Sequence, residues 1–411
     1  MRILFITNLF PPYELGGMEQ LCQEIVDALR VRGHRCHVLT SRYGVIGAKQ
    51  PEDSVDRLLY LETGIHHYRP LDFFLCRYKQ DRANHDILHR TIETFEPDIV
   101  FIWGMWNLST KIACLSEQWM PGKVAYNIAS YWPIDPDPHI QYWSDPGRRP
   151  WAKILLRPVA LLAKRLLTIE KHPPNPSFEN VSTCSEYVLE RLKEAGIVPR
   201  NGAVILNGID PTPFDELSCD KPMVDGALRL LYFGGLMPHK GVHTAIQALG
   251  YLDAWGQCNS VRLTIIGSGQ PDYEAYLRRL TDELKLSDRV TFVGRVERSA
   301  IPEFLARHDV FVFTSIWPEP FGRTIIEAMA AGLAVVGTDM GGSREIFQHY
   351  HQGMLFPAGD PRALADRIQC IQMQPELLNE LRHSGRNLVR THFTLERMVN
   401  EVESWLGMIA E

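Results

Sequence analysis

The sequence lacks the cysteine pairs that hold small disulfide-rich or metal-binding domains together. Its 8 cysteines are scattered along 411 residues, and none belongs to a Cys-x-x-Cys pair. Scattered cysteines in a long chain are typical of reduced, partly buried thiols and not of a disulfide framework. We therefore predict a protein of a reducing compartment.

The sequence also lacks a long apolar run, a secretory leader and an excess of positive charge. No uncharged apolar stretch approaches the ~20 residues that cross a bilayer, and the chain begins with a strand-like run at residues 3–7 instead of a leader. The net charge of -6 offers no general attraction for nucleic acid. These absences predict a cytoplasmic protein without a nucleic-acid partner.

Strand-like and helix-like segments alternate along the first half of the chain. A strand at residues 3–7, a helix at 18–31 and a strand at 36–40 form a βαβ unit, which requires a parallel sheet. The alternation continues with strands at 99–103, 124–129, 181–183 and 204–206 and helices at 81–95 and 185–195. With hydrophobic residues at 45%, the chain can form the cores of two or three domains of roughly 150 residues each.

A segment rich in proline, aspartate and glycine at residues 207–227 predicts a linker between two domains. The alternation starts again at Leu228, with strands at 228–233, 263–266, 290–293, 310–313 and 334–337 and helices at 242–252, 323–331 and 363–371. The pattern predicts an α/β protein with domains at 1–206 and 228–394. Apolar residues recur at helical spacing within 395–411, which predicts a core-packing helix at the chain end.

The most informative stretch is residues 319–332, where a loop leads into the helix at 323–331. Gly322 allows a close backbone approach at the start of this helix, and Gly332 suits the left-handed residue that ends it. The unpaired amides of a helix start attract phosphate. Glu319 and Glu327 flank this start, and ionised carboxylates suit sugar and ribose hydroxyls. For a lone pair of glutamates, a solvated loop residue and a helix-surface residue would be the commoner interpretation.

Other loops carry residues that suit a phosphate ligand. Lys240 precedes the helix at 242–252 and could meet a phosphate as a point charge, although an exposed loop lysine is the alternative. Gly16 and Gly17 lie too far from the first strand to form a G-x-G-x-x-G fingerprint, so a tight turn is the simplest interpretation of that pair.

These motifs resemble one family. Glu319 and Glu327, with Phe321 and Gly322 between them, resemble the E-x-F-G-x-x-x-x-E signature of the retaining glycosyltransferases of family 4. Further segments agree in order with that family, at residues 1–42, 207–210, 232–249, 263–269, 290–296 and 319–346. Gly234, Gly235 and Leu236, followed by Lys240 and Gly241, resemble the family's G-R-L and K-G motifs.

The resemblance implies the GT-B fold, with two Rossmann-like domains whose parallel sheets face a central cleft. It implies a metal-independent, retaining hexosyltransferase of polysaccharide biosynthesis, which moves a sugar from a nucleotide-diphosphate sugar to the hydroxyl of a glycan, lipid or small molecule. The donor is a substrate, and no cofactor or metal is expected. The last helix, 395–411, is expected to cross back onto the first domain.

The resemblance also assigns roles to individual residues. Glu319, which meets the donor-sugar hydroxyls, and Lys240, which meets the diphosphate, are the expected catalytic residues. Glu327 is expected at the ribose hydroxyls and the backbone near Val296 at the base. The remaining donor-binding residues are Gly16, Gly17, Gly235, Gly267, Phe321, Gly322, Arg323 and Thr324.

The sequence departs from the family pattern at two places. Gly235 stands where the family has an arginine that partners the lysine on the diphosphate, and Arg323 and Arg295 are the candidates to replace it. Ala129 stands where the H-D-Y-W-P pattern has its acceptor-side histidine. These departures leave open a non-catalytic nucleotide-sugar-binding protein, and the fold also leaves open a nucleotide-sugar epimerase or a sugar phosphorylase.

Two further patterns have competing interpretations. Asp135 and Asp137 form a D-x-D sequence, but each precedes a proline, and we predict no metal site there. Residues 151–171 form a basic amphipathic helix that Pro158 is expected to kink or divide. Such a helix can contact the inner membrane face peripherally. We favour a helix whose apolar stripe packs on the core, the stripe being Trp151, Leu155, Val159, Leu162, Leu166 and Ile169.

Overall fold

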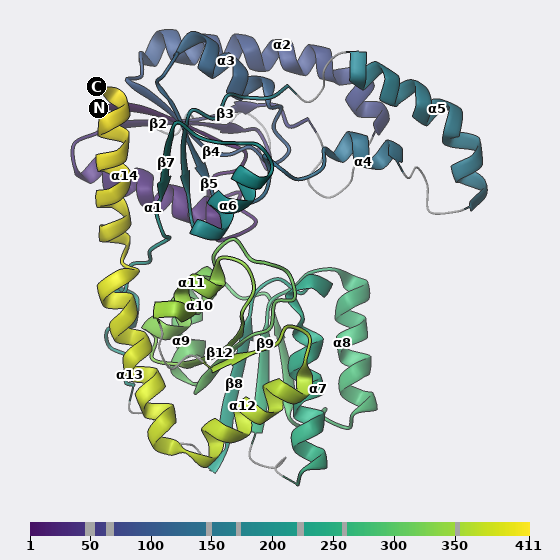
Figure 1. Ribbon diagram of the computed structural model, residues 1–411, viewed down its shortest axis with the longest axis vertical. Helices are drawn as coiled ribbons and strands as arrows, with labels where there is room; N and C mark the ends of the chain where they lie inside the picture. Colours follow the sequence, from purple (N-terminus) through teal and green to yellow (C-terminus); the bar gives the residue numbers. More distant parts are fainter. Residues whose placement is uncertain are drawn as a thin grey trace. The chain divides into compact units, whose positions relative to one another are not determined.

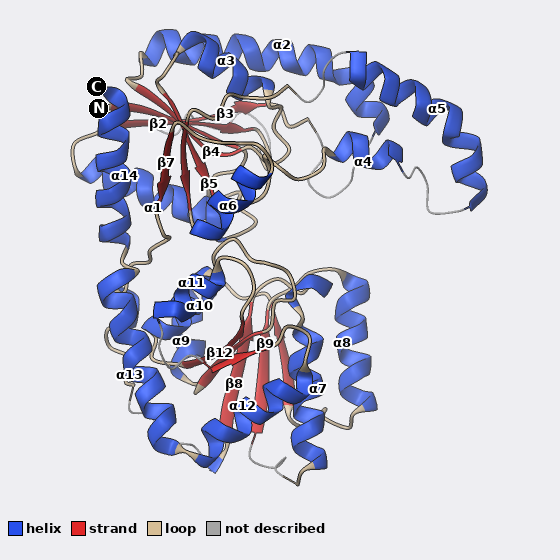
Figure 2. Ribbon diagram, in the orientation of Figure 1, coloured by secondary structure: helices blue, strands red, loops and turns tan. Residues whose placement is uncertain are grey.

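The computed structural model describes residues 1–45, 54–62, 70–144, 150–169, 174–219, 226–256, 261–349 and 354–411. The chain forms two compact units (Figure 1). Unit 1 contains Met1–Thr183, Val188–Ile205 and Val399–Glu411, and unit 2 contains Cys184–Tyr187 and Leu206–Met398. Figure 2 shows each sheet as a group of red strands flanked by blue helices. Within the described ranges, every helix is too short or too polar to span a bilayer.

Unit 1 is built on a parallel sheet with the strand order β3-β2-β1-β4-β5-β6-β7. The central strands read as continuous apolar runs because helices cover both faces of a parallel sheet. The strands are β1 (Arg2–Thr7), β2 (Arg35–Ser41), β3 (Val55–Leu59), β4 (Ile99–Gly104), β5 (Val124–Ile128), β6 (Asn180–Thr183) and β7 (Asn201–Val204). The helices that begin in this half are α1 (Gly17–Val31), α2 (Pro70–Phe95), α3 (Lys111–Trp119), α4 (Pro138–Ser144), α5 (Pro150–Ile169) and α6 (Glu186–Glu194).

The predicted first βαβ unit is confirmed as β1, α1 and β2, paired in parallel. The last strand of the sheet lies at Asn201–Val204 and not at 204–206, because it is a short, largely exposed edge strand without an apolar run. Sequence periodicity did not indicate β3, α3 or α4. The helix predicted at 81–95 is longer than expected and begins at Pro70.

Unit 2 is built on a second parallel sheet, with the order β10-β9-β8-β11-β12-β13. Its strands are β8 (Leu228–Phe233), β9 (Val261–Ile266), β10 (Val290–Gly294), β11 (Val310–Phe313), β12 (Ala334–Thr338) and β13 (Met354–Phe356). Its helices are α7 (Val242–Ala254), α8 (Pro271–Glu283), α9 (Ile301–Ala306), α10 (Arg323–Ala330), α11 (Ser343–His349), α12 (Pro361–Met373) and α13 (Pro375–His392). The five strands predicted for this half are therefore confirmed.

The chain goes from one unit to the other in two places, after β7 and within the last helix. α14 (Leu395–Ala410) begins in unit 2, and its remainder belongs to unit 1, where Trp405 lies against Phe101 with ring centroids 6.2 Å apart. Ile209 pairs with Thr394, and Asn207 and Phe214 are buried. Residues 207–219 therefore pack within unit 2, while 220–225 of the expected linker lie outside the described residues.

The packing predicted for the amphipathic helix is wrong for the described side chains of α5. Val159, Leu162, Leu166 and Ile169 are all exposed. α5 instead packs through Ala160, Ala163 and Leu167 against Trp143, beside α4 (Figure 1). Small side chains allow this close approach and leave the larger apolar stripe outside. Of the two effects expected of Pro158, a kink or a division, the division does not occur, because one helix continues through it.

Candidate donor site

The strand order of unit 2 reverses between β8 and β11, which places a topological switch point there. In open parallel sheets, ligands bind outside the carboxyl ends of the strands at such a point. The loop after β8 carries Gly235 and Lys240, and the loop after β11 carries Glu319. The two expected catalytic residues thus come from the two strands that flank the switch point.

Hydrogen bonds to main-chain carbonyls hold these two loops together. The Thr314 hydroxyl donates to the Lys240 carbonyl at 2.9 Å, and the Ile316 amide donates to the His239 carbonyl at 2.9 Å. Gly241 has a φ of +66°, and a Cβ on it would lie 2.1 Å from the Thr314 carbonyl oxygen. Only glycine accommodates both this backbone conformation and this close approach.

Lys240 and Glu319 contact each other directly. The Lys240 Nζ lies 2.6 Å from Glu319 Oε1, and the Ser315 hydroxyl donates to the same oxygen at 2.8 Å. The Glu319 backbone is also fixed, because its carbonyl accepts from the Gly342 amide at 2.7 Å. The site therefore presents a cation and a carboxylate side by side, from two loops that hydrogen bonds join. Ser315 is a member of this cluster that the sequence analysis did not identify.

The helix start beside this pair is formed as expected. Gly322 has a φ of +105° and caps α10, whose first residue is Arg323. Gly332, just beyond the helix, has a φ of +72°. Thr324 is half-buried in the first turn, and the Phe321 side chain is buried against Phe393. The Phe321 side chain is thus part of the core, which leaves its backbone for any ligand contact.

Glu327 is a buried carboxylate held by two arginines. Its side chain is only 3% exposed, and Oε1 lies 2.5 Å from Arg298 Nη2 and 3.3 Å from Arg323 Nε. The interpretation of Glu327 as a solvated helix-surface residue is therefore wrong. A buried carboxylate is costly unless it is paired, so the arginines explain how the position is maintained. Arg298 could not be identified from the sequence, because it lies 29 residues from Glu327 and outside α10.

The glycines expected at the donor differ in their surroundings. Gly267 has a φ of +137°, and a Cβ on it would lie 1.9 Å from the Gly234 carbonyl oxygen, so it brings the ends of β8 and β9 together. A Cβ on Gly235 would meet no atom within 4 Å in the described part of the chain. The Gly235 carbonyl accepts from the Tyr232 hydroxyl at 2.9 Å, and burial raises the pKa of Tyr232 well above its usual value.

The residues considered as replacements for the missing arginine lie in different settings. Arg323 contacts Glu327, as described above, while Arg295 is exposed on the segment after β10. Val296, the residue expected near the base, follows Arg295 and is half-buried.

The other expected donor residues, Gly16 and Gly17, lie in unit 1. Gly16 is the extended N-cap of α1, Gly17 is its first residue, and the Gly16 amide donates to Glu19 Oε2 at 3.0 Å. This pair is therefore a helix start and not the tight turn that the sequence suggested.

Among the described residues, no group of three or more His, Cys, Asp or Glu side chains is arranged to hold a metal ion. Asp137 of the D-x-D sequence binds backbone amides at the start of α4. Its Oδ1 accepts from the amides of His139 and Ile140, each at 2.9 Å. Such a contact satisfies amides that the helix itself leaves unpaired.

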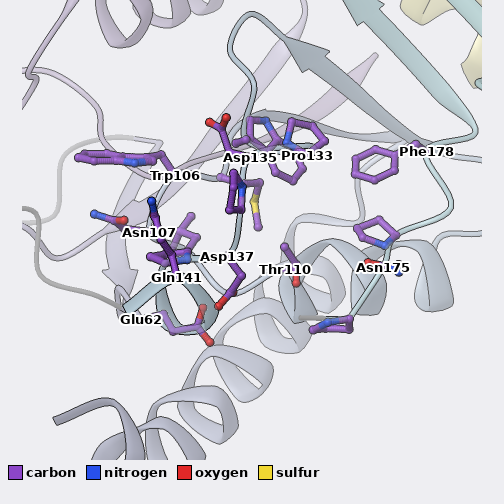
Figure 3. Close-up of a pocket in the computed structure, with 17 residues that line it drawn as sticks. Glu62, Trp106, Asn107, Thr110, Pro133, Asp135, Asp137, Gln141, Asn175 and Phe178 are labelled. Carbon is purple, nitrogen blue, oxygen red and sulfur yellow. The ribbon is translucent and has the colours of Figure 1, made fainter. Parts of the chain in front are cut away.

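Unit 1 contains a second candidate site, a pocket of about 430 Å³ (Figure 3). It lies among the loops after β3, β4 and β5 and the segment before β6. The side chains that Figure 3 labels are Glu62, Trp106, Asn107, Thr110, Pro133, Asp135, Asp137, Gln141, Asn175 and Phe178.

The two parallel sheets and their loops define a GT-B protein, and comparisons with known families agree. The profile described as "Glycosyltransferase Family 4" matches residues 15–212, and that described as "Glycosyl transferases group 1" matches residues 215–388. The chain therefore belongs to the group 1 glycosyltransferases of family 4.

Individual relatives are similar over part of their length. The putative glycosyltransferase YtcC of Bacillus subtilis is 28% identical over 236 residues, which cover 52% of this chain and 56% of the relative. The phosphatidyl-myo-inositol mannosyltransferase of Mycobacterium leprae is 31% identical over 194 residues, which cover 46% and 49% of the two chains. The chain spans about half the length of the curated relatives that it matches.

Solved structures share the fold over the whole chain. A glycosyltransferase from Rickettsia africae has a TM-score of 0.71 at 19% identity and covers 100% of this chain and 98% of its own. Anabaena HepE, solved in complex with UDP-glucose, has a TM-score of 0.69 at 20% identity, with 99% and 100% coverage.

Proposed function

We propose that this protein is a retaining, metal-independent glycosyltransferase that moves a sugar from a nucleotide-diphosphate donor to an acceptor hydroxyl. The observation that carries the proposal is the Lys240–Glu319 pair at the switch point of unit 2, next to the N-terminus of α10. A lysine and a helix start suit a diphosphate, and a carboxylate suits sugar hydroxyls. The complexes of Anabaena HepE with UDP and UDP-glucose support this class of donor.

The proposed chemistry is stabilisation of the leaving group. As the anomeric C–O bond breaks, negative charge develops on the departing diphosphate, and fixed donors there lower the barrier more than they stabilise the bound substrate. When the donor binds, the Lys240 ammonium group would leave Glu319 and contact the diphosphate. The Glu319 carboxylate would then accept hydrogen bonds from the sugar hydroxyls. The acceptor oxygen forms the new bond on the face that the diphosphate leaves, and its proton goes to the diphosphate. Glu327 would meet the ribose, supported by Arg298 and Arg323.

The two-carboxylate mechanism of glycosidases is not proposed. It requires one carboxyl group that is protonated as an acid and a second that attacks as a nucleophile. Glu319 is paired with a lysine and Glu327 with two arginines. Both carboxylates are thus engaged in ion pairs, and these contacts do not distinguish one as an acid and the other as a nucleophile.

A thermal-shift panel of nucleotide sugars, followed by product analysis, tests the proposal. A donor at 100 times its Kd should stabilise the folded protein by about 2.7 kcal/mol. With that donor and a panel of acceptors, NMR should show a glycoside that keeps the donor's anomeric configuration, formed equally well with EDTA. An epimerase would change the donor sugar without an acceptor, a phosphorylase would require phosphate, and a binding protein would show the thermal shift without turnover.

A further inference from the structure

The pocket of unit 1 differs in chemistry from the donor site of unit 2. Its carboxyl-end loops include residues 105–110, which follow β4, and β1 and β4 flank the point where the strand order of this sheet reverses. A switch point is where a parallel sheet places its ligand. At about 430 Å³, the pocket falls within the ~300–1,000 Å³ typical of small-molecule sites.

The pocket combines flat aromatic surfaces with hydrogen-bonding side chains. Trp106 is 49% exposed at one end, Phe178 lies at the opposite end, and Thr110 lies between them (Figure 3). Trp132 adds a second indole to the lining, and Asn107, Gln141 and Asn175 add amides. A pyranose has an apolar face of C–H groups and a rim of hydroxyls, which match aromatic faces and amide or carboxylate groups respectively.

The charged side chains that the described residues contribute to the lining are of one sign. Glu62, Asp135 and Asp137 contribute carboxylates, while no lysine, arginine or histidine of the described chain lines the pocket. Burial raises the pKa of Asp135 above its usual value, so its negative charge is already unfavourable there. An anionic ligand would meet side chains of like charge in this lining, and such a juxtaposition is strongly unfavourable.

We propose that this pocket binds a pyranose of the acceptor that carries no anionic group, and that it rejects phosphorylated and uronic sugars. The proposal rests on the proposed function, because it names the acceptor class of the same reaction. Neutral sugars and amino sugars share the required chemistry, and the experiment distinguishes them. The donor site and this pocket can be tested separately, since they lie in different units.

Saturation-transfer NMR with methyl hexosides, the matching hexosamines, uronates and 6-phosphates tests the pocket. Neutral or amino sugars should give signals that excess UDP does not remove, and the anionic sugars should bind at least ~10-fold more weakly. Trp106→Ala should abolish the signals, and Tyr251→Ala, which removes an exposed aromatic ring of α7, should not. Asp135→Lys should admit the 6-phosphate. A thermal shift with nucleotide sugar checks in each variant that unit 2 is intact.

Two results would overturn this assignment while leaving the donor site unaffected. One is the absence of binding by every neutral and amino sugar in a protein that binds nucleotide sugar. The other is equal or tighter binding of the phosphorylated sugars by the unchanged chain. Failure of donor binding with sugar signals intact would instead count against the proposed function.

A second inference rests on the exposed stripe of α5. Val159, Leu162, Leu166 and Ile169 recur three and four residues apart, so they form one face of the helix. Leu161 and Leu162 are 64% and 60% exposed, and Ile169 is 67% exposed. Exposed apolar patches of this kind mark interaction sites.

Cationic side chains flank this apolar face. Arg157 and Arg165 are exposed and Lys164 is half-buried, while the 13 residues from Arg157 to Ile169 include no aspartate or glutamate. This combination complements a bilayer surface with anionic headgroups, where apolar side chains enter the interface and cations meet phosphate. We propose that α5 docks unit 1 on an anionic membrane surface as a peripheral contact.

Vesicle sedimentation tests this docking surface. The protein should sediment with phosphatidylglycerol–phosphatidylcholine vesicles at low salt, much less with phosphatidylcholine alone, and be released at high salt. Leu161→Ser combined with Leu162→Ser should reduce the sedimented fraction severalfold. Val198→Ser is the matched control, because Val198 is an exposed residue elsewhere in unit 1. Sedimentation unchanged by the leucine substitutions, or absent throughout, would overturn the inference. A dimer that these substitutions dissociate would identify a second copy of the chain as the occupant instead.

Discussion

Lys240 and Glu319 illustrate how much of the candidate site depends on single contacts. They lie 79 residues apart in the sequence, yet their charged groups are 2.6 Å apart. Ser315 donates to the same carboxylate oxygen at 2.8 Å. Because each residue is assigned to a different part of the donor, their substitution should affect binding and turnover differently.

Lys240→Ala should lower kcat as well as donor affinity. The diphosphate gains charge in the transition state, and losing a charge-assisted contact costs about 1.5–3 kcal/mol, roughly a 10- to 150-fold loss in kcat/KM. Glu319→Ala should lower turnover while free nucleotide binds as before, because its proposed partner is the sugar. Initial rates and nucleotide competition measure both, with Lys193→Ala of α6 as control. Full turnover by the Glu319 variant would contradict the assignment.

Glu327→Ala should chiefly weaken nucleotide binding. Ribose contacts change little during bond cleavage, so their loss should raise KM for the donor and weaken free nucleotide in parallel, with little change in kcat. Arg298→Ala should have the same effect in a milder form, because Arg323 still pairs with the buried carboxylate. Calorimetric titration with free nucleotide checks both variants. A normal nucleotide affinity in Glu327→Ala would exclude the ribose role.

Two histidines of unit 2 predict how stability depends on pH. Burial, together with the neighbouring Lys240 charge, lowers the pKa of His239 from 6.5, and burial lowers that of His243. The folded state thus binds fewer protons than the unfolded state, and the free energy of unfolding should fall as the pH drops below about 6.5. Urea unfolding across this range should show a flatter profile in the His239→Gln, His243→Gln double variant. His89→Gln, which replaces a half-exposed histidine of α2, is the control.

At the scale of elements, two loops that follow β8 and β11 depend on one glycine. The Gly241 backbone conformation and its approach to Thr314 bring the Lys240 loop against the Glu319 loop. Helix and strand propensity do not encode this contact, because it joins segments that are distant in the sequence. A single methyl group is therefore expected to disturb both loops.

Gly241→Ala should reduce turnover more than a substitution that causes only the same backbone strain. Alanine in a left-handed conformation costs about 1–2 kcal/mol, and the added Cβ would also press against the Thr314 carbonyl. Gly256→Ala is the matched control, since its φ is +75° and no described atom lies within 4 Å of the added Cβ. Thermal unfolding and donor kinetics of both variants separate strain from displacement. Equal loss in the two variants would show that the contact is irrelevant.

At the scale of the whole molecule, the chain end completes the core of the unit in which the chain begins. Val399–Glu411 belongs to unit 1, and Trp405 is buried against Phe101 of β4. After Ile205 the chain continues in unit 2, and it returns to unit 1 after Met398. Each unit nevertheless has its own sheet and its own core, so damage to one core should leave the ligand chemistry of the other recognisable.

Trp405→Ala should destabilise unit 1 by about 3–5 kcal/mol, the usual cost of truncating a buried tryptophan. Met408→Ala, on the same helix, should have little effect because Met408 is exposed. Scanning calorimetry should show the Trp405 variant unfolding earlier in a transition that nucleotide does not shift, while the transition of unit 2 still rises with nucleotide. If nucleotide binding were lost in the same transition in which unit 1 unfolds, the two units would not unfold separately.

The sequence by itself determined the alternation of strands and helices, the repeated α/β design and the helix start at Gly322. These features follow from local apolar runs and from the backbone needs of glycine, which act over a few residues. Elements with a weak apolar pattern could not be predicted in this way. The edge strand β7 is largely exposed, and α4 begins at Pro138 within a proline-rich stretch.

Only the tertiary structure decided which partners the charged residues have and which face of α5 is covered. Glu327 is buried because Arg298, which lies outside α10, and Arg323 pair with it, and no local pattern specifies the first of these contacts. The stripe on α5 has the same periodicity whether it meets a core or solvent. Whether the stripe is buried depends on whether a neighbouring element packs against it. In this protein Trp143 packs against the face that carries Ala160 and Ala163, and the stripe is left exposed.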